Sequence, residues 1–147
     1  MKLKGLLSIG VTDILGTGIS GIFWFFLAAL IDPENFGEIF YYIGIASLVS
    51  YISLIGTQDT IIVYVAKKIK IQSTLNIISL VIGGISLIVI ITIFDRIDVG
   101  FLLLAFVINT LAIGDLLGRN LYNSYSKYFL IQKILTLVLG FGFYYLF

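Results

Sequence analysis

The sequence predicts an all-α, polytopic membrane protein: a helix bundle with about five transmembrane helices and its N-terminus in the cytoplasm. Hydrophobic residues make up 60% of the 147 residues and charged residues only 12%, and the mean hydropathy is +1.14. A soluble domain of this composition would expose a large apolar surface to water. The few charges also fall between long uncharged runs rather than within them.

The first two uncharged runs extend from residue 14 to 31 and from 39 to 58. Such a run indicates a membrane-spanning helix, because about 20 residues at about 1.5 Å per residue cross a hydrocarbon core of about 30 Å. The polar turn between them holds Asp32, Pro33 and Gly37, which we interpret as turn and cap residues. Asp32 suits a helix N-cap, and Pro33 suits the first helical position, where no N–H donor is needed. The sequence therefore predicts a transmembrane hairpin.

Further uncharged runs predict three more spans. The segment from Thr60 to Ile71 has too few polar residues for an ordinary loop. Either the second helix continues past the membrane surface, or a break near Gly56 lays a short segment along the inner interface. The chain reaches Phe147 within an apolar run, which predicts the N-terminal part of a longer transporter or a truncated relative of one. The five expected spans lie near residues 6–31, 36–56, 72–94, 99–118 and 128–147.

Lysine and arginine mark the expected cytoplasmic side. Of the nine such residues, only Arg96 falls on the opposite side. Cytoplasmic loops carry an excess of Lys and Arg, so all four predicted loops favour one orientation. We expect a multi-pass protein of the cell membrane with its N-terminus inside and its C-terminus outside. The expected inner residues are Lys2, Lys4, Lys67, Lys68, Lys70, Arg119, Lys127 and Lys133.

The first two spans also carry a resemblance to a known family. The turn reads DPENFG at residues 32–37, and it is followed by LIG at 54–56 and VAKK at 65–68. These elements resemble the start of the polysaccharide-biosynthesis flippases, whose superfamily also holds the multidrug exporters. The family usually has Gly where this chain has Asp32. The connector and fifth span, at residues 123–141, are similar to the family as well.

The resemblance implies a transporter of two six-helix lobes that rock about a central cavity. Its substrate would be a polyisoprenoid-linked oligosaccharide, whose lipid tail stays in the bilayer while the cavity shelters the sugars and phosphates. The partner of this chain would be a second lobe or further copies of the chain. The family's cavity tends to be basic, whereas this chain offers little buried positive charge beyond Arg119. We expect no nucleic-acid partner.

The composition disfavours an enzyme. There is no Cys and no His, so the chain lacks a thiolate nucleophile, the commonest general base and the metal sites that these residues build. We expect no catalytic residue, no cofactor and no metal. The AIGD sequence at residues 112–115 resembles the Gly-x-Gly-Asp loop of intramembrane aspartyl proteases. Its first glycine is missing and no second aspartate motif accompanies it, so we exclude that chemistry.

Four polar residues are substrate-pathway candidates: Asp13, Asn109, Asp115 and Arg119. Polar groups at membrane depth are costly, so those that occur there often have a function. Asp13 in the first span would bind a cation or proton, or, as we favour, it is an interfacial acid paired with a lysine. Asn109 more often bridges two helices than contacts a ligand.

Asp115 and Arg119 are four residues apart and share a helix face. Arg119 would meet the pyrophosphate of a lipid-linked sugar, and Asp115 would compete for the guanidinium. The simpler alternative, which we favour, is an anchor that topology alone requires, with a neighbouring acid. Gly114 and Gly118 have the same spacing on the adjacent face, which lets another helix approach closely.

Two functions stand as alternatives to the flippase. The first is a cation-coupled exporter of the multidrug type, in which Asp13 is the coupling acid. The second is a membrane scaffold that assembles with partners through its glycine faces and transports nothing.

Overall fold

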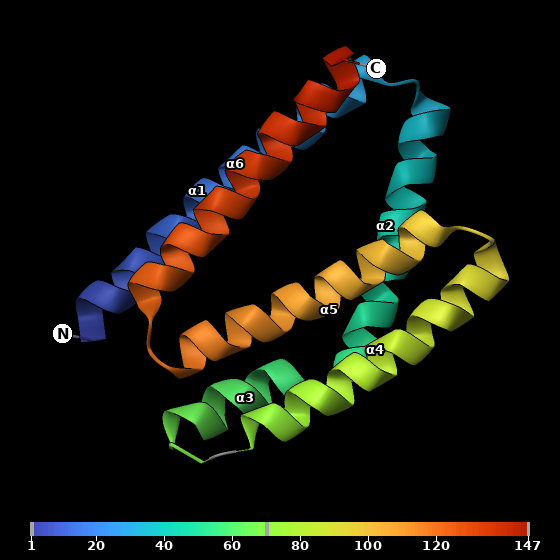
Figure 1. Cartoon of the computed structure of the whole chain (residues 1–147). Helices are drawn as coiled ribbons and strands as arrows, with labels where there is room; N and C mark the ends of the chain where they lie inside the picture. The colour runs from blue at the N-terminus through green and yellow to red at the C-terminus, as the bar shows by residue number, and fades with distance from the viewer. Residues whose placement is uncertain (1, 70, 147) are drawn as a thin grey trace. The chain divides into compact units, whose positions relative to one another are not determined.

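Helices make up nearly all of the described chain, and no strand occurs within it. The computed structural model describes the backbone of residues 2–69 and 71–146, and the side chains of residues 5, 7–69 and 71–142. The all-α fold class that the sequence predicts is confirmed. Lys70 and Phe147 lie outside the described residues. The helices are α1 (Lys2–Leu30), α2 (Pro33–Leu54), α3 (Thr57–Ala66), α4 (Gln72–Phe94), α5 (Ile97–Gly118) and α6 (Tyr122–Leu146) (Figure 1).

By length and composition, four helices of the described chain can cross a membrane. They are Leu7–Leu30, Pro33–Leu54, Gln72–Phe94 and Ile97–Gly118, and they correspond to the first four predicted spans. The fifth predicted span forms α6, a helix of 25 residues. It is not one of these four, so its crossing of the membrane stays a prediction.

The helices divide into two compact units. The first unit consists of Met1–Phe36 and Leu121–Phe147, and the second of Gly37–Asn120. In the first unit, α1 and α6 pack side by side and run parallel (Figure 1). The sequence predicts that the first and fifth spans both lead from the cytoplasm outward. Two helices with the same direction run parallel, as α1 and α6 do. Aromatic rings of one helix lie against glycines of the other, in the pairs Gly5 with Tyr122, Gly16 with Phe129, and Phe23 with Gly140.

The turn between α1 and α2 ends at Pro33, the first residue of α2. The Asp32 carbonyl accepts a hydrogen bond from the Phe36 N–H at 2.9 Å, and Glu34 stands in the first turn, near the positive end of the helix dipole. Gly37 lies inside α2, with helical backbone and open space where a Cβ would stand. Gly37 is therefore a helical residue and not the turn residue that the sequence predicts, because proline fits the first helical position and the helix begins four residues earlier.

A break separates α2 from α3. Ile55 and Gly56 both have left-handed backbone, with φ of 45° and 69°. This region is unfavourable for a β-branched residue such as isoleucine and free of strain for glycine. The Gly56 carbonyl then accepts bonds from the Thr60 N–H at 3.2 Å and the Thr60 hydroxyl at 3.0 Å. Of the two possibilities for this segment, the chain therefore takes the break, and the position of α3 relative to the membrane surface stays a prediction.

The core of the second unit lies where α3, α4 and α5 meet. Ile61 of α3 and Leu103 and Val107 of α5 are fully buried. The α3 helix runs alongside the last turns of α5, because its residues from Gln58 to Val65 contact Gly114 and then Gly118.

Gly114 and Gly118 allow this approach. A Cβ on Gly118 would lie 3.0 Å from the Cβ of Val65 and 3.2 Å from the carbonyl oxygen of Ile61. A Cβ on Gly114 would lie 3.4 Å from the carbonyl oxygen of Gln58. The close helix contact that the sequence predicts at these glycines is thus made by α3 of the same chain.

Buried hydroxyl groups connect the helices of this unit. The Ser53 and Ser86 hydroxyls are 2.9 Å apart and link α2 to α4. Ser79 donates to the Thr57 hydroxyl at 2.9 Å and links α4 to α3. Small polar residues at helix contacts are typical of membrane proteins, in which hydrogen bonds and close packing hold helices together.

At the other end of the unit, Arg96 connects α2 to the α4–α5 turn. Its guanidinium bonds to Glu38 at 2.9 Å and to Asp98 at 3.0 Å, and it lies 4.6 Å from the centre of the Tyr42 ring. The hydrogen bond with Asp98, followed by that with Glu38, raises the pKa of Arg96 further above its ordinary value. Because exposed ion pairs contribute little stability, this cluster mainly fixes the geometry of the turn.

The close contact at Gly118 limits the size of the side chain that this position can hold. We expect Gly118→Val to lower the free energy of unfolding by about 1–3 kcal/mol, because the added carbons would force α3 away from α5. Unfolding of the detergent-solubilised protein, followed by far-ultraviolet circular dichroism, measures the change. Gly84→Val is the control, since nothing lies within 4 Å of a Cβ at Gly84 and valine is a better helix former than glycine. Equal effects of the two variants would contradict the prediction.

Candidate functional site

A polar cluster joins the start of α4 to the end of α5. Arg119, directly after α5, donates from Nε to Asp115 Oδ1 at 2.7 Å. Gln72, the first residue of α4, donates from Nε2 to the same oxygen at 2.6 Å. The Gln72 Oε1 atom in turn accepts from Arg119 Nη2 at 3.3 Å. These three residues, here called the α4–α5 polar cluster, close a ring of hydrogen bonds.

Exposure differs across this cluster. The Asp115 side chain is 28% exposed and the Arg119 side chain 54% exposed. A guanidinium carries five N–H donors, and within the described residues Arg119 uses its Nε and one Nη2 donor. The cluster therefore holds the guanidinium in place and still presents donors to an anion. Its net charge is zero, because Asp115 balances Arg119.

A pocket of about 270 Å³ lies beside the cluster, between α4 and α5. Gln72, Asn76 and Asp115 line its polar part, and Leu80 and Ile108 are among its apolar residues. The Asn76 Oδ1 atom is buried and accepts no hydrogen bond from any described residue. Leaving a buried carbonyl oxygen without a donor costs about 1–3 kcal/mol. This oxygen is therefore a local cost to the stability of the second unit.

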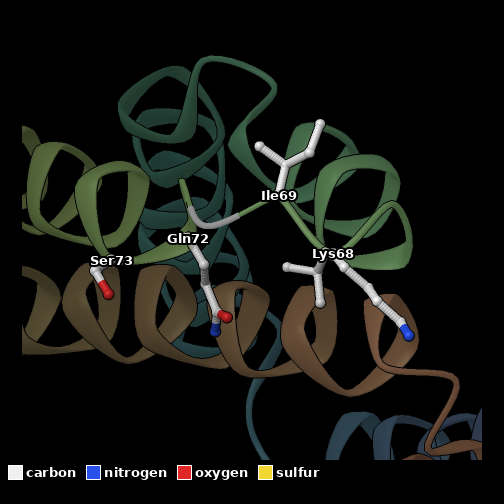
Figure 2. A pocket seen from close by; sticks show the side chains of 5 residues that line it. Lys68, Ile69, Gln72 and Ser73 are labelled. Atoms are coloured by element: carbon white, nitrogen blue, oxygen red, sulfur yellow. The ribbon is translucent and has the colours of Figure 1, made fainter.

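A second pocket, of about 280 Å³, shares Gln72 with the first. Val65, Lys68, Ile69 and Ser73 complete its lining. Figure 2 shows Gln72 and Ser73 on the first turn of α4, with Lys68 and Ile69 on the turn that leads from α3. Basic, polar and apolar side chains therefore meet in one small pocket.

Asp13 belongs to the other unit and contacts α6. The Tyr125 hydroxyl donates to Asp13 Oδ1 at 2.7 Å, and Tyr125 is buried. Burial, and then the hydrogen bond to Asp13, raises the pKa of Tyr125 above its ordinary value, so the phenol keeps its proton and acts as the donor. The lysine partner that we favoured for Asp13 is not found among the described side chains, and a phenol takes its place.

The structure brings together only two of the four substrate-pathway candidates that the sequence predicts. Asp115 and Arg119 contact each other, whereas Asn109, half-buried on α5, is not among the residues that line the pocket beside them. Asp32 and Pro33 serve the α1–α2 turn.

Sequence reasoning missed Gln72, Asn76 and Tyr125. Gln72 and Asn76 stand four residues apart at the start of an otherwise apolar helix. That spacing places them on one helix face, and it is the feature of the sequence that indicates a polar site there. No spacing within the sequence relates Tyr125 to Asp13, which lies 112 residues away.

Replacing the amide side chains of Gln72 and Asn76 should change the free energy of unfolding in different ways. We expect Gln72→Leu to lower the free energy of unfolding by about 0.5–1.5 kcal/mol, because Asp115 and Arg119 each lose a hydrogen-bond partner that water replaces only in part. Asn76→Leu should leave this free energy unchanged or raise it, since it removes a buried oxygen that has no donor. Denaturation in detergent, at equal protein concentration, measures the change in the free energy of unfolding for each variant. An unchanged free energy of unfolding in Gln72→Leu would show that the cluster does not stabilise the fold.

Within the described residues, no group of three carboxylates is placed to hold a metal ion. Comparison of the chain with protein-family models, with curated proteins and with solved structures finds no match.

Proposed function

We propose that the chain is part of a membrane transporter that moves a polyisoprenoid-linked oligosaccharide across the cell membrane. The sequence elements at residues 32–37, 54–56 and 65–68 resemble the flippases that carry such lipids. One structural observation supports the proposal most strongly: a carboxylate and an amide hold Arg119 at the end of α5, and its remaining donors bond to none of the described residues.

This arrangement suits reversible binding of phosphate. The planar guanidinium matches two phosphate oxygens at once. Asp115 competes for the same donors, so an arriving phosphate must displace a carboxylate before it binds fully. A transporter has to release its substrate, and a built-in competitor makes that release easier. No covalent chemistry is required, because the task is to lower the cost of moving polar groups through hydrocarbon.

The adjoining pocket supports an amphiphilic substrate. Its polar part presents the Gln72 amide and the Asp115 carboxylate, which can accept a hydrogen bond from a sugar hydroxyl. Leu80 and Ile108 offer apolar surface to an isoprenoid chain. The volume of about 270 Å³ is below the usual range for a drug-sized ligand. The pocket therefore accommodates one phosphate or sugar unit, and we propose that a second lobe shelters the rest.

Binding of a fluorescent polyisoprenyl-diphosphate sugar to the chain in nanodiscs tests this proposal. We expect saturable binding that Arg119→Gln weakens about tenfold, as the loss of one charge-assisted hydrogen bond implies. Asp115→Asn should tighten binding, because the competing charge is removed.

Lys133→Gln is the matched control, since it removes a cation of the other unit that lies over the Phe129 ring. Equal weakening by Arg119→Gln and Lys133→Gln, or the absence of saturable binding, would overturn the proposal.

The contact between Asp13 and Tyr125 favours a second candidate function, cation-coupled export. An acid within a membrane span that a buried phenol holds in place is a suitable coupling group for protons or sodium. The scaffold alternative has less support, because Gly114 and Gly118 contact α3 of the same chain and are not available to another protein.

Asp13→Asn distinguishes the exporter from the flippase. For an exporter, we expect dye efflux from proteoliposomes to follow an imposed proton or sodium gradient, and Asp13→Asn to abolish that dependence because the coupling charge is gone. Asp59→Asn, which alters an exposed acid on α3, serves as the control and should leave the dependence of efflux on the gradient unchanged. If the gradient has no effect on the unmodified chain, the exporter function is excluded.

A further inference from the structure

The turn between α3 and α4 places a lysine where a glycine would be less strained. The Ile69 N–H bonds to the Tyr64 carbonyl at 3.0 Å, and the Lys68 N–H bonds to the Val65 carbonyl at 2.9 Å. This pair of bonds is a Schellman motif, which usually has glycine at the position of Lys68. Lys68 has a φ of 60°, a conformation that costs a non-glycine residue stability. A strained residue often has a function, so the lysine side chain is a candidate for one.

Lys68 lines the second pocket, and its charge is not neutralised there. Among the described residues, no carboxylate forms an ion pair with it. In Figure 2 the Lys68 ammonium group points away from Gln72 and Ser73, and the flexible stem of lysine lets it turn toward the pocket when an anion binds. The Ser73 hydroxyl and the Gln72 amide add hydrogen-bonding groups on the first turn of α4 (Figure 2). The polar part of this pocket therefore carries one positive charge.

Apolar side chains form the remainder of the pocket. Val65 and Ile69 line it, and Ile69 is 43% exposed. A ligand that fits must combine an anionic group with an adjoining hydrocarbon part. The volume of about 280 Å³ suits a lipid headgroup with its first carbons and is small for an oligosaccharide.

We propose that this pocket binds the phosphodiester headgroup of an anionic phospholipid from the cytoplasmic leaflet. A phosphodiester carries a single negative charge, which matches the single ammonium group of the pocket. The sequence places Lys67, Lys68 and Lys70 within four residues at the predicted inner end of the helices. Such basic clusters beside a membrane span attract the anionic lipids of that leaflet. This site does not rest on the proposed transport function, although it shares Gln72 with the α4–α5 polar cluster.

Native mass spectrometry of the full chain, released from micelles that contain phosphatidylglycerol or phosphatidylcholine, tests the site. We expect the chain to retain phosphatidylglycerol preferentially. Lys68→Gln should weaken retention about tenfold or more, because it removes a charge-assisted hydrogen bond to the phosphate. Lys67→Gln is the matched control, because it makes the same charge change one residue away and outside the pocket lining. It should weaken retention no more than about fivefold, the share of one lysine near an anionic surface.

Two further variants separate binding from folding. Lys68→Gly should stabilise the α3 end and weaken retention of phosphatidylglycerol, so that the two measurements move in opposite directions. Ser73→Ala should weaken retention, whereas Thr74→Ala, outside the lining, should not.

Equal loss in the Lys67 and Lys68 variants would overturn the proposal, because it would indicate only general attraction to an anionic surface. Competition by soluble glycerol phosphate as effective as that by the lipid would overturn it as well. The assay contains no lipid-linked sugar and measures no transport, so its result is independent of the flippase proposal.

Discussion

The contact of α3 with the last turn of α5 at Gly118 positions both pockets of the second unit. The chain leaves α3 and begins α4 after only a short turn, so the place where α3 packs largely determines where Gln72 stands. From there Gln72 reaches the Asp115 carboxylate at 2.6 Å. A side chain at Gly118 would push α3 outward, and the start of α4 would move with it. The glycine thus supports the polar cluster without contacting it.

This reliance on close contact follows from the solvent. In a bilayer, lipid tails are as apolar as leucine, so the hydrophobic effect does not drive helices together. The second unit instead uses glycine contacts and hydroxyl pairs such as Ser79 with Thr57, while many large hydrophobic side chains remain exposed on its helices. Each such hydrogen bond contributes only about 0.6–2 kcal/mol. Several of them, spread over α2, α3 and α4, are needed to fix one arrangement.

Local features of the structure could be predicted from the sequence, and features that depend on register between helices could not. The start of α2 at Pro33 and the contact of Asp115 with Arg119 depend on neighbours one or four residues away, which the sequence displays directly. Gln72 joins the cluster only because α4 and α5 are antiparallel with one particular offset, and Tyr125 meets Asp13 only because α1 and α6 are parallel. Hydrophobic runs indicate that helices exist and leave their offsets undetermined.

The two cations near Gln72 differ in a way that suits different tasks. Arg119 is balanced by Asp115, so an anion that binds there must replace a carboxylate and is readily lost again. Lys68 has no carboxylate partner among the described residues, so an anion that binds there displaces only water. A passing substrate requires the first arrangement, because tight binding would stop transport. A lipid that stays with the protein requires the second. That contrast is why we propose the end of α5 for a transported phosphate and the turn before α4 for a resident phospholipid.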